Sequence, residues 1–267
     1  MNLYPRISEF HFGLEKPVKI LHLTDAHLAL TYASEGEEVN ARSAHRRDVF
    51  FREAEFPQRD PVGYLEDAME YSKQFDCTVI TGDVLDLVFE RSKDEARRIL
   101  AGKDYMFCAG NHEFCKHGVP ETFATRKQLA EEVQPIFRGN MFFESRIVGG
   151  VNIITVDNSY LLFTEEQLDL LKAEVARGLP ILLFCHCPLN DRWKNPDYYA
   201  SSSFQRGATD EMIEIGCRVV RYIEEEPLIK AIFAGHYHFN ATEHLGNKTT
   251  YILGGLFKGI VGEILID

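Results

Sequence analysis

Short hydrophobic runs recur along the first half of the chain, and polar stretches with helical spacing separate them. Three of the runs are typical of strands, at residues 17–24, 77–81 and 105–109. Residues 64–72 and 89–101 lie between these runs and show the apolar spacing of amphipathic helices. This alternation of strands and helices predicts a parallel sheet with right-handed crossovers.

The pattern changes near residue 140, where two strand-like runs, 141–145 and 151–156, follow each other with no helix between them and with a Gly149-Gly150 turn just before the second. Consecutive strands without a helix predict a second sheet. Thr164 and Gln167 form a capping-box signature for the start of another helix. The other expected elements are helices at 121–133 and 212–225 and strands at 180–185, 228–234, 249–253 and 259–266.

Two long polar stretches, residues 31–60 and 187–206, interrupt this pattern without clear apolar periodicity, and we expect both to be loop inserts. Arg46 in the first is a candidate for substrate contact, although such a charged run is more often a solvated face. Trp193 and Tyr198 in the second are candidates for a lid that stacks on a base or sugar. The same aromatic residues could instead fix the loop to the protein, and the sequence does not separate these readings.

Residues able to bind metal ions follow five of the hydrophobic runs. In chain order they are Asp25 and His27, Asp83 and Asp86, Asn111 and His112, His186, and His236 and His238. Any one of them alone would more often be a turn residue or a hydrogen-bonded core histidine, which is the role we expect for His22. Together they predict one site, because α/β sheets place their ligands at the carboxyl ends of strands.

In this order, Asp-x-His, Gly-Asp-x-x-Asp, Gly-Asn-His-Glu, a single His and Gly-His-x-His resemble the motifs of the calcineurin-like metallophosphoesterase superfamily of binuclear-metal phosphatases and phosphodiesterases. The resemblance runs from Asp25 to His238 and implies an α/β fold, a two-sheet β-sandwich flanked by helices in four layers, α/β/β/α. It also implies hydrolysis of a phosphoester by a hydroxide held between two divalent metal ions, with manganese, iron and zinc as the candidates.

The resemblance further implies a role for each residue. It assigns one metal ion to Asp25, His27, Asp83 and His238, and the other to Asp83, Asn111, His186 and His236, so that Asp83 bridges them. His112 would be the general acid that protonates the leaving group, and Asp86 would orient it. Asp86 could alternatively cap a helix that begins near Leu87.

The composition bounds the substrate. We expect residues 1–267 to form a single domain. Their formal charge of -12 argues against binding a polyanion such as nucleic acid and favours a small phosphorylated substrate such as a nucleotide.

No apolar run reaches about 18 residues and the first residues lack a signal-type segment, so we expect a cytoplasmic protein with no membrane contact. Six scattered cysteines are typical of buried, reduced thiols.

Three functions are compatible with the motifs. The leading hypothesis is a phosphodiesterase or phosphomonoesterase acting on a small substrate, and the motifs do not separate these two activities. A nuclease of the same superfamily is an alternative that the acidic charge disfavours. A non-catalytic scaffold that keeps the fold is the third, and the presence of every expected ligand argues against it. The sequence indicates no oligomeric state.

Overall fold

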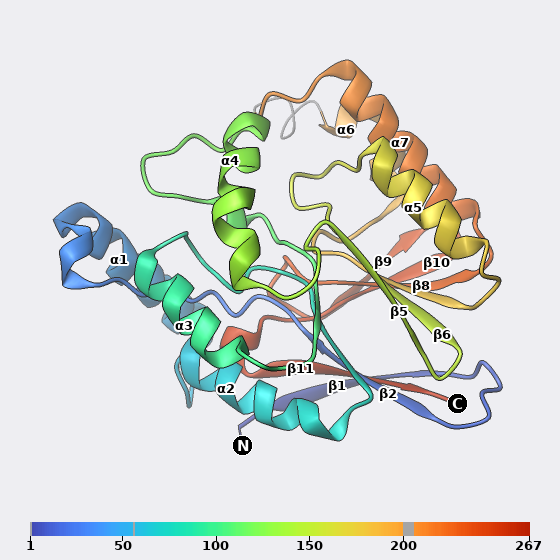
Figure 1. Cartoon of the computed structure of the whole chain (residues 1–267), viewed down its shortest axis with the longest axis horizontal. Helices are drawn as coiled ribbons and strands as arrows, with labels where there is room; N and C mark the ends of the chain where they lie inside the picture. Colours follow the sequence, from blue (N-terminus) through green and yellow to red (C-terminus); the bar gives the residue numbers. More distant parts are fainter. Residues whose placement is uncertain (1, 56, 200–205) are drawn as a thin grey trace.

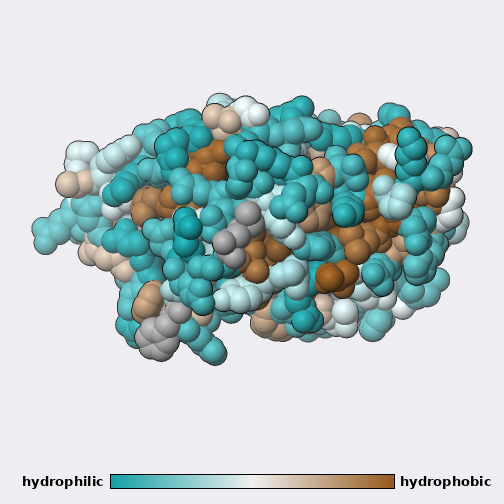
Figure 2. Space-filling model, turned by 90° about the horizontal axis from the view of Figure 1, so that it is seen from below, coloured by the Kyte–Doolittle hydropathy of each residue, from teal (hydrophilic) through white to brown (hydrophobic). Residues whose placement is uncertain are grey.

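Two β-sheets stack against each other, and helices flank them on both sides (Figure 1). This computed structural model describes residues 2–55, 57–199 and 206–267. Its main hydrophobic clusters lie between the first sheet and its helices, between the two sheets, and between the second sheet and its helices. The predicted α/β/β/α layering is therefore confirmed. Seen from below, the surface is mostly hydrophilic, with hydrophobic side chains in separate areas (Figure 2).

The first sheet has the strand order β1-β11-β2-β3-β4. Its strands are β1 (Tyr4–Phe10), β2 (Val18–Leu23), β3 (Cys77–Ile80), β4 (Met106–Phe107) and β11 (Ile260–Ile266). Strands β2, β3 and β4 are parallel, as predicted. The sequence does not predict β1, because this edge strand pairs only with β11 and most of its residues are exposed, so it needs no continuous hydrophobic run.

The second sheet has the strand order β5-β6-β7-β8-β10-β9. Its strands are β5 (Phe143–Val148), β6 (Val151–Val156), β7 (Ile181–Phe184), β8 (Ile229–Ala234), β9 (Ala241–Leu245) and β10 (Lys248–Ile252). The predicted β5–β6 hairpin is present, and β6, β7 and β8 are parallel. The polar edge strand β9 was missed for the same reason as β1.

The helices largely agree with the sequence pattern. They are α1 (Glu37–Glu53), α2 (Pro61–Tyr71), α3 (Glu90–Leu100), α4 (Phe123–Val133), α5 (Glu165–Val175), α6 (Pro196–Tyr199) and α7 (Asp210–Glu225). Short 3-10 turns occupy Ala33–Glu35, Ser72–Gln74, His112–Phe114, Gln134–Ile136, Asp191–Lys194 and Leu256–Lys258. The side chain of Thr164 accepts a hydrogen bond from the Gln167 backbone N–H, so the predicted capping box is confirmed.

The expectation that residues 31–60 form a loop insert is wrong, because 17 of them form helix α1. The sequence pattern does not predict this helix, because only Ser43 and Phe50 on it are buried and its sequence therefore shows no apolar stripe. The side of α1 that faces the protein is held by polar contacts instead. The Ser43 hydroxyl, for example, donates to the backbone carbonyl of Ala29 at 2.7 Å.

The stacking lid expected in residues 187–206 is not supported where the structure describes this segment. Trp193 is only 1% exposed and packs in the hydrophobic cluster beneath the second sheet's helices, beside Phe163. Tyr198 is half-buried against the same cluster. Trp193 therefore fixes the segment to the protein, which is the alternative that the sequence left open. Residues 200–205, which the expected insert also contained, lie outside the described residues.

His22 on β2 is a core histidine, as the sequence predicts. The residue is 2% exposed, and its ring lies edge-on to Phe184 and Phe233 between the two sheets. Its Nε2 is 2.8 Å from Thr81 Oγ1. Burial lowers the pKa of His22 to about 3, so the ring is neutral in the folded protein at neutral pH.

This buried imidazole makes the free energy of unfolding depend on pH. Because the pKa of His22 is lower in the folded protein than its ordinary 6.5, its contribution to stability is complete above pH 6.5 and is lost as the pH falls towards 3. At pH 5 the loss is about 2 kcal/mol. Urea denaturation of His22→Gln should therefore show a smaller loss of stability between pH 7 and pH 5 than the unsubstituted protein. Equal losses would contradict this assignment.

Candidate metal centre

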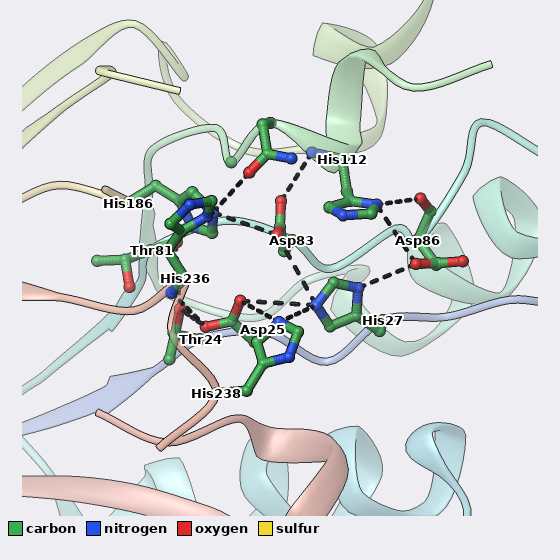
Figure 3. Close-up of polar contacts among 12 residues, drawn as sticks. Thr24, Asp25, His27, Thr81, Asp83, Asp86, His112, His186, His236 and His238 are labelled. Carbon is green, nitrogen blue, oxygen red and sulfur yellow. Dashed lines mark hydrogen bonds and ion pairs between the residues drawn. The ribbon is translucent and has the colours of Figure 1, made fainter. Parts of the chain in front are cut away.

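Five loops, each following a strand, meet at one edge of the sandwich (Figure 3). Strands β2, β3 and β4 of the first sheet and β7 and β8 of the second lead into these loops. Parallel strands end at the same edge of a sheet, so the residues that follow them converge. The residues brought together are Asp25, His27, Asp83, Asp86, Asn111, His112, His186, His236 and His238.

Asp25, His27, Asp83 and His238 form one group, whose possible ligand atoms all lie within 4.8 Å of one another. His27 Nε2 is 3.0 Å from His238 Nε2. Asp25 Oδ1 is 3.6 Å from the first of these nitrogens and 3.5 Å from the second. Neighbouring ligands bound at about 2.1 Å to one metal ion lie roughly 3 Å apart, so this spacing suits a shared cation.

A second group forms around His186. Its Nε2 lies 3.2 Å from Asn111 Oδ1 and 3.1 Å from His236 Nδ1. Asp83 Oδ2 is 3.2 Å from the same His186 nitrogen and 3.8 Å from His27 Nε2. This carboxylate oxygen therefore faces both groups, which is the position that the sequence motifs imply for a bridging ligand.

Two buried carboxylate oxygens of the site, Asp25 Oδ1 and Asp83 Oδ2, have no hydrogen-bond partner among the described residues. The other oxygen of each group is satisfied. Asp25 Oδ2 accepts from the backbone N–H of His236, and Asp83 Oδ1 accepts from that of His112. An unpaired buried carboxylate oxygen is costly, and cations satisfy it. Together with the mixed oxygen and imidazole donors, these two atoms show that the site fits divalent metal ions.

Hydrogen bonds at the outer ring nitrogens orient the histidines. His186 Nδ1 is 2.7 Å from the backbone oxygen of Thr81, and His238 Nδ1 is 3.0 Å from Glu53 Oε1. His27 Nδ1 is 3.2 Å from Asp86 Oδ1. A ring nitrogen that donates to such an oxygen carries the proton, which leaves the lone pair on the other nitrogen, facing the site. These three rings therefore present Nε2 lone pairs to a cation.

The backbone at the site is strained. Seven non-glycine residues of the described chain have φ between 52° and 70°, and five of them are candidate metal ligands: Asp25, His27, Asp83, His236 and His238. Such left-handed conformations cost about 1–3 kcal/mol each and persist only where the surrounding structure enforces them. Their concentration here indicates that the fold positions these side chains at the expense of local stability.

Close backbone packing holds the loops after β3 and β4 together. Gly82 has φ of +80°, and a Cβ added there would lie 2.1 Å from the backbone nitrogen of Gly110. Glu113 is fully buried, and its carboxylate accepts hydrogen bonds from the backbone N–H groups of Asp83, Leu85 and Gly110. Glu113 therefore braces both loops, including the residue that faces the two metal-binding groups.

Asp86 lies between three cationic or potentially cationic groups. Arg46 donates two hydrogen bonds to its carboxylate, at 2.8 and 2.7 Å, and His27 Nδ1 lies 3.2 Å from it. His112 Nδ1 is 2.6 Å from the backbone oxygen of Asp86 and 3.3 Å from its carboxylate. The alternative of a helix cap is wrong, because α3 begins at Glu90 and its N-cap is Phe89.

Comparisons with known proteins agree with this arrangement. The sequence profile of the calcineurin-like phosphoesterase family matches residues 18–240. The chain belongs to this family. Among solved structures, a dimetal phosphatase from Danio rerio is 14% identical with a TM-score of 0.50, over 91% of this chain and 89% of that one. A purple acid phosphatase from yellow lupin (Lupinus luteus) is 15% identical with a TM-score of 0.55, over 91% and 45%. No curated protein sequence matches significantly.

Membership of the calcineurin-like phosphoesterase family indicates metal-dependent hydrolysis of phosphoesters, whereas the two solved structures, at such low identity, support the fold alone. The clustered histidines and aspartates are candidate metal ligands in keeping with this chemistry. No helix in the described part of this phosphoesterase combines the length and apolar character that crossing a bilayer requires.

The charges of this phosphoesterase site are strongly coupled. Burial opposes protonation of His27, but its contacts with Asp25 and Asp86 outweigh burial and raise its pKa to about 10. In the same way, burial lowers and Asp83 raises the pKa of His186, and the result is about 9. A metal ion competes with protons for these nitrogens, so metal affinity should fall at acid pH. Burial lowers the pKa of His112, against the opposing charges of Asp83 and Asp86.

One face of helix α1 supports the site. Arg46, Phe50 and Glu53 on this face contact Asp86, His27 and His238 respectively. The Phe50 ring stacks on the His27 ring with centroids 4.3 Å apart. Arg46 was a candidate from the sequence, whereas Phe50 and Glu53 were missed. Their helical spacing was the available signal, but the helix itself had not been recognised.

Removing the charge of Glu53 should weaken metal binding. Glu53 lies 3.0 Å from His238 Nδ1, and losing such an outer contact typically lowers metal affinity 10–100-fold. We expect Glu53→Gln to bind Mn²⁺ about tenfold or more weakly by equilibrium dialysis. Glu37→Gln removes the same charge from the exposed first turn of α1 and should leave affinity unchanged. If the two variants bound Mn²⁺ with equal affinity, the contact between Glu53 and His238 would not contribute to metal binding.

Proposed function

We propose that this family member hydrolyses a phosphoester in a small phosphorylated substrate, using two divalent cations. The observation that carries this proposal is the position of the buried Asp83 Oδ2, which accepts no hydrogen bond from the described residues and lies 3.2 Å from His186 Nε2 and 3.8 Å from His27 Nε2. One cation would be held by Asp25, His27, Asp83 and His238, and the other by Asp83, Asn111, His186 and His236. Mixed carboxylate, amide and imidazole ligands suit manganese, iron and zinc.

When bound, the cations polarise the phosphoryl oxygens and lower the pKa of a water molecule. The protein's own part is to fix their ligands rigidly. Asp83 is held by Glu113 at its backbone and by the His112 N–H at Oδ1, so its remaining oxygen cannot turn away from the centre. The neutral Asn111 amide adds a ligand oxygen without another negative charge, which keeps the site attractive to an anionic phosphoester.

His112 is the proposed general acid. Its Nδ1 is held by the backbone oxygen of Asp86, which leaves Nε2 to donate a proton to the leaving oxygen. In the reaction the oxygen of water bonds to phosphorus and the bond from phosphorus to the leaving oxygen breaks. The leaving oxygen takes the proton from His112, and the proton released by water returns to solvent, from which His112 is reprotonated. The Asp86 carboxylate, 3.3 Å from Nδ1, stabilises the protonated ring.

The charge of the chain supports a small substrate over a nucleic acid. At -12 the protein repels an extended polyanion, whereas one phosphoester needs only local positive charge, which two divalent cations supply. Arg46 is 19% exposed at its side chain and already donates both hydrogen bonds to Asp86, so its first role is to neutralise that buried carboxylate. Arg46 therefore belongs to the charge balance of the site.

The proposal is tested by measuring hydrolysis of bis-p-nitrophenyl phosphate and p-nitrophenyl phosphate side by side. The protein is stripped of metal with a chelator and reloaded with Mn²⁺, Fe²⁺ or Zn²⁺. We expect turnover of at least one compound that depends on the added metal, and the preferred compound assigns the diester or the monoester activity. Metal-independent turnover, or cleavage of DNA in preference to both compounds, would contradict the proposal.

A further inference from the structure

A cavity of about 300 Å³ opens beside His112. This volume lies at the lower end of the range for ligand pockets. Basic side chains dominate its polar lining: Arg42 and Arg46 from helix α1, and Lys116 and His117 from the loop after β4. Arg42 and Arg46 are four residues apart, so they project from the same face of α1. None of these four residues belongs to the metal-ligand motifs.

The positive charge of this cavity is only partly compensated. Lys116 pairs with Glu132 at 2.8 Å, and Arg46 pairs with Asp86. Arg42 forms no hydrogen bond or ion pair with any residue that the structure describes. A cation without a partner beside other basic groups is unexpected in a chain with a net charge of -12, and it favours an anionic ligand.

The acidic groups near the cavity do not cancel this charge. Glu121 also lines it, but Arg206 lies 3.5 Å from the Glu121 carboxylate. The nearest acidic group to His117 is Glu38, whose side chain is 92% exposed and 3.9 Å away. The cavity therefore keeps an excess of cationic hydrogen-bond donors.

The position of the cavity indicates which part of a substrate would enter it. In Figure 3, His112 and Asp86 lie together on one side of Asp83, and His186 and His236 lie on the other. His112 itself lines the cavity. A proton donor must lie next to the oxygen that it protonates, so the group attached to the leaving oxygen extends on the His112 side.

We propose that this cavity binds a second phosphate, carried by the leaving group of the substrate. The substrate class is thus a bisphosphorylated small molecule, in which one phosphate is hydrolysed at the metal centre and the other is bound by Arg42 and Lys116. Arginine and lysine donors form strong, charge-assisted hydrogen bonds to phosphate. This inference rests on the proposed function and narrows its substrate.

The test compares two substrates that differ only in the second phosphate, propane-1,3-diol bisphosphate and propyl phosphate, by release of inorganic phosphate from the Mn²⁺-loaded protein. The unsubstituted protein should show a lower KM for the bisphosphate. Arg42→Ala should lower kcat/KM for the bisphosphate about tenfold more than for propyl phosphate, mainly through KM, because a hydrogen bond to a charged group is lost. Arg42→Lys should recover part of this difference.

Arg52→Ala is the matched control, since Arg52 lies on the same helix, is exposed and pairs with Asp48 away from the cavity. Arg52→Ala removes the same charge and should leave kcat and KM for both substrates unchanged. Calorimetric binding of the bisphosphonate analogue, with CH₂ in place of each ester oxygen, should weaken in Arg42→Ala and not in Arg52→Ala. If the protein hydrolyses both substrates but Arg42→Ala and Arg52→Ala have equal kcat/KM for the bisphosphate, the second-phosphate site is overturned. The phosphoesterase proposal then still stands. Hydrolysis of neither would overturn both.

Discussion

Asp83→Asn is expected to lower kcat for p-nitrophenyl phosphate by about 10³-fold or more, which corresponds to roughly 4 kcal/mol of lost transition-state stabilisation. Asp83 Oδ2 is the oxygen that faces both candidate metal-binding groups. Asparagine replaces one carboxylate oxygen by an NH₂ group, which cannot bind a cation, and it removes the negative charge. Metal analysis of the purified variant should accordingly find fewer bound ions than in the unsubstituted protein.

Asparagine is chosen over alanine because Asp83 has φ of 52°, a conformation that asparagine tolerates better than most residues. The variant should also keep the hydrogen bond that Asp83 Oδ1 accepts from the His112 N–H. With the backbone conformation and this hydrogen bond kept, the metal-stripped variant should still unfold in one cooperative thermal transition, like the metal-stripped unsubstituted protein. A variant with two bound metal ions and full activity would exclude Asp83 as the bridge.

His112→Asn is expected to lower kcat by about 10²–10⁴-fold for phenyl phosphate and far less for p-nitrophenyl phosphate. Phenolate is a strong base, with a pKa near 10 as in tyrosine, and needs a proton to leave. The nitro group makes p-nitrophenolate a much weaker base, so it departs without help. The ratio of the two kcat values measures proton donation directly, and metal content should stay unchanged because His112 is not among the proposed ligands.

The control for this substitution is His45→Asn, which changes an exposed histidine on helix α1. It should alter neither kcat value. If His112→Asn slowed both substrates by the same factor, His112 would be a positioning residue for the phosphoryl group and another group would protonate the leaving oxygen.

The candidate ligands could be predicted from the sequence because each of them directly follows a hydrophobic strand. Parallel strands end at the same edge of a sheet, so local patterns alone bring together Asp25 and Asp83, which follow neighbouring strands of the first sheet. His186 follows a strand of the second sheet, so its place at the same site depends on how the two sheets stack. The parallel pairing of β2 with β3 confirms what the alternation of strands and helices predicted. The roles of these residues remain predictions until metal binding is measured.

Helix α1 could not be predicted in the same way. Its inward contacts are made by Arg46, Phe50 and Glu53, and their partners are site residues far away in the sequence. A helix held by such contacts shows no apolar stripe, so local patterns describe it as a polar loop. The prediction that Trp193 contacts substrate was wrong for the opposite reason. An aromatic residue in a polar stretch of sequence is expected to be exposed, whereas the fold buries Trp193.

We propose that two cations, bridged by Asp83, act together in hydrolysis. The most direct test is to titrate the metal-stripped protein with Mn²⁺ and to follow bound metal and phosphoesterase activity in the same samples. Activity should rise until two ions are bound per chain, and Asp83→Asn should not reach this stoichiometry. Full activity with one bound ion, or with none, would contradict it.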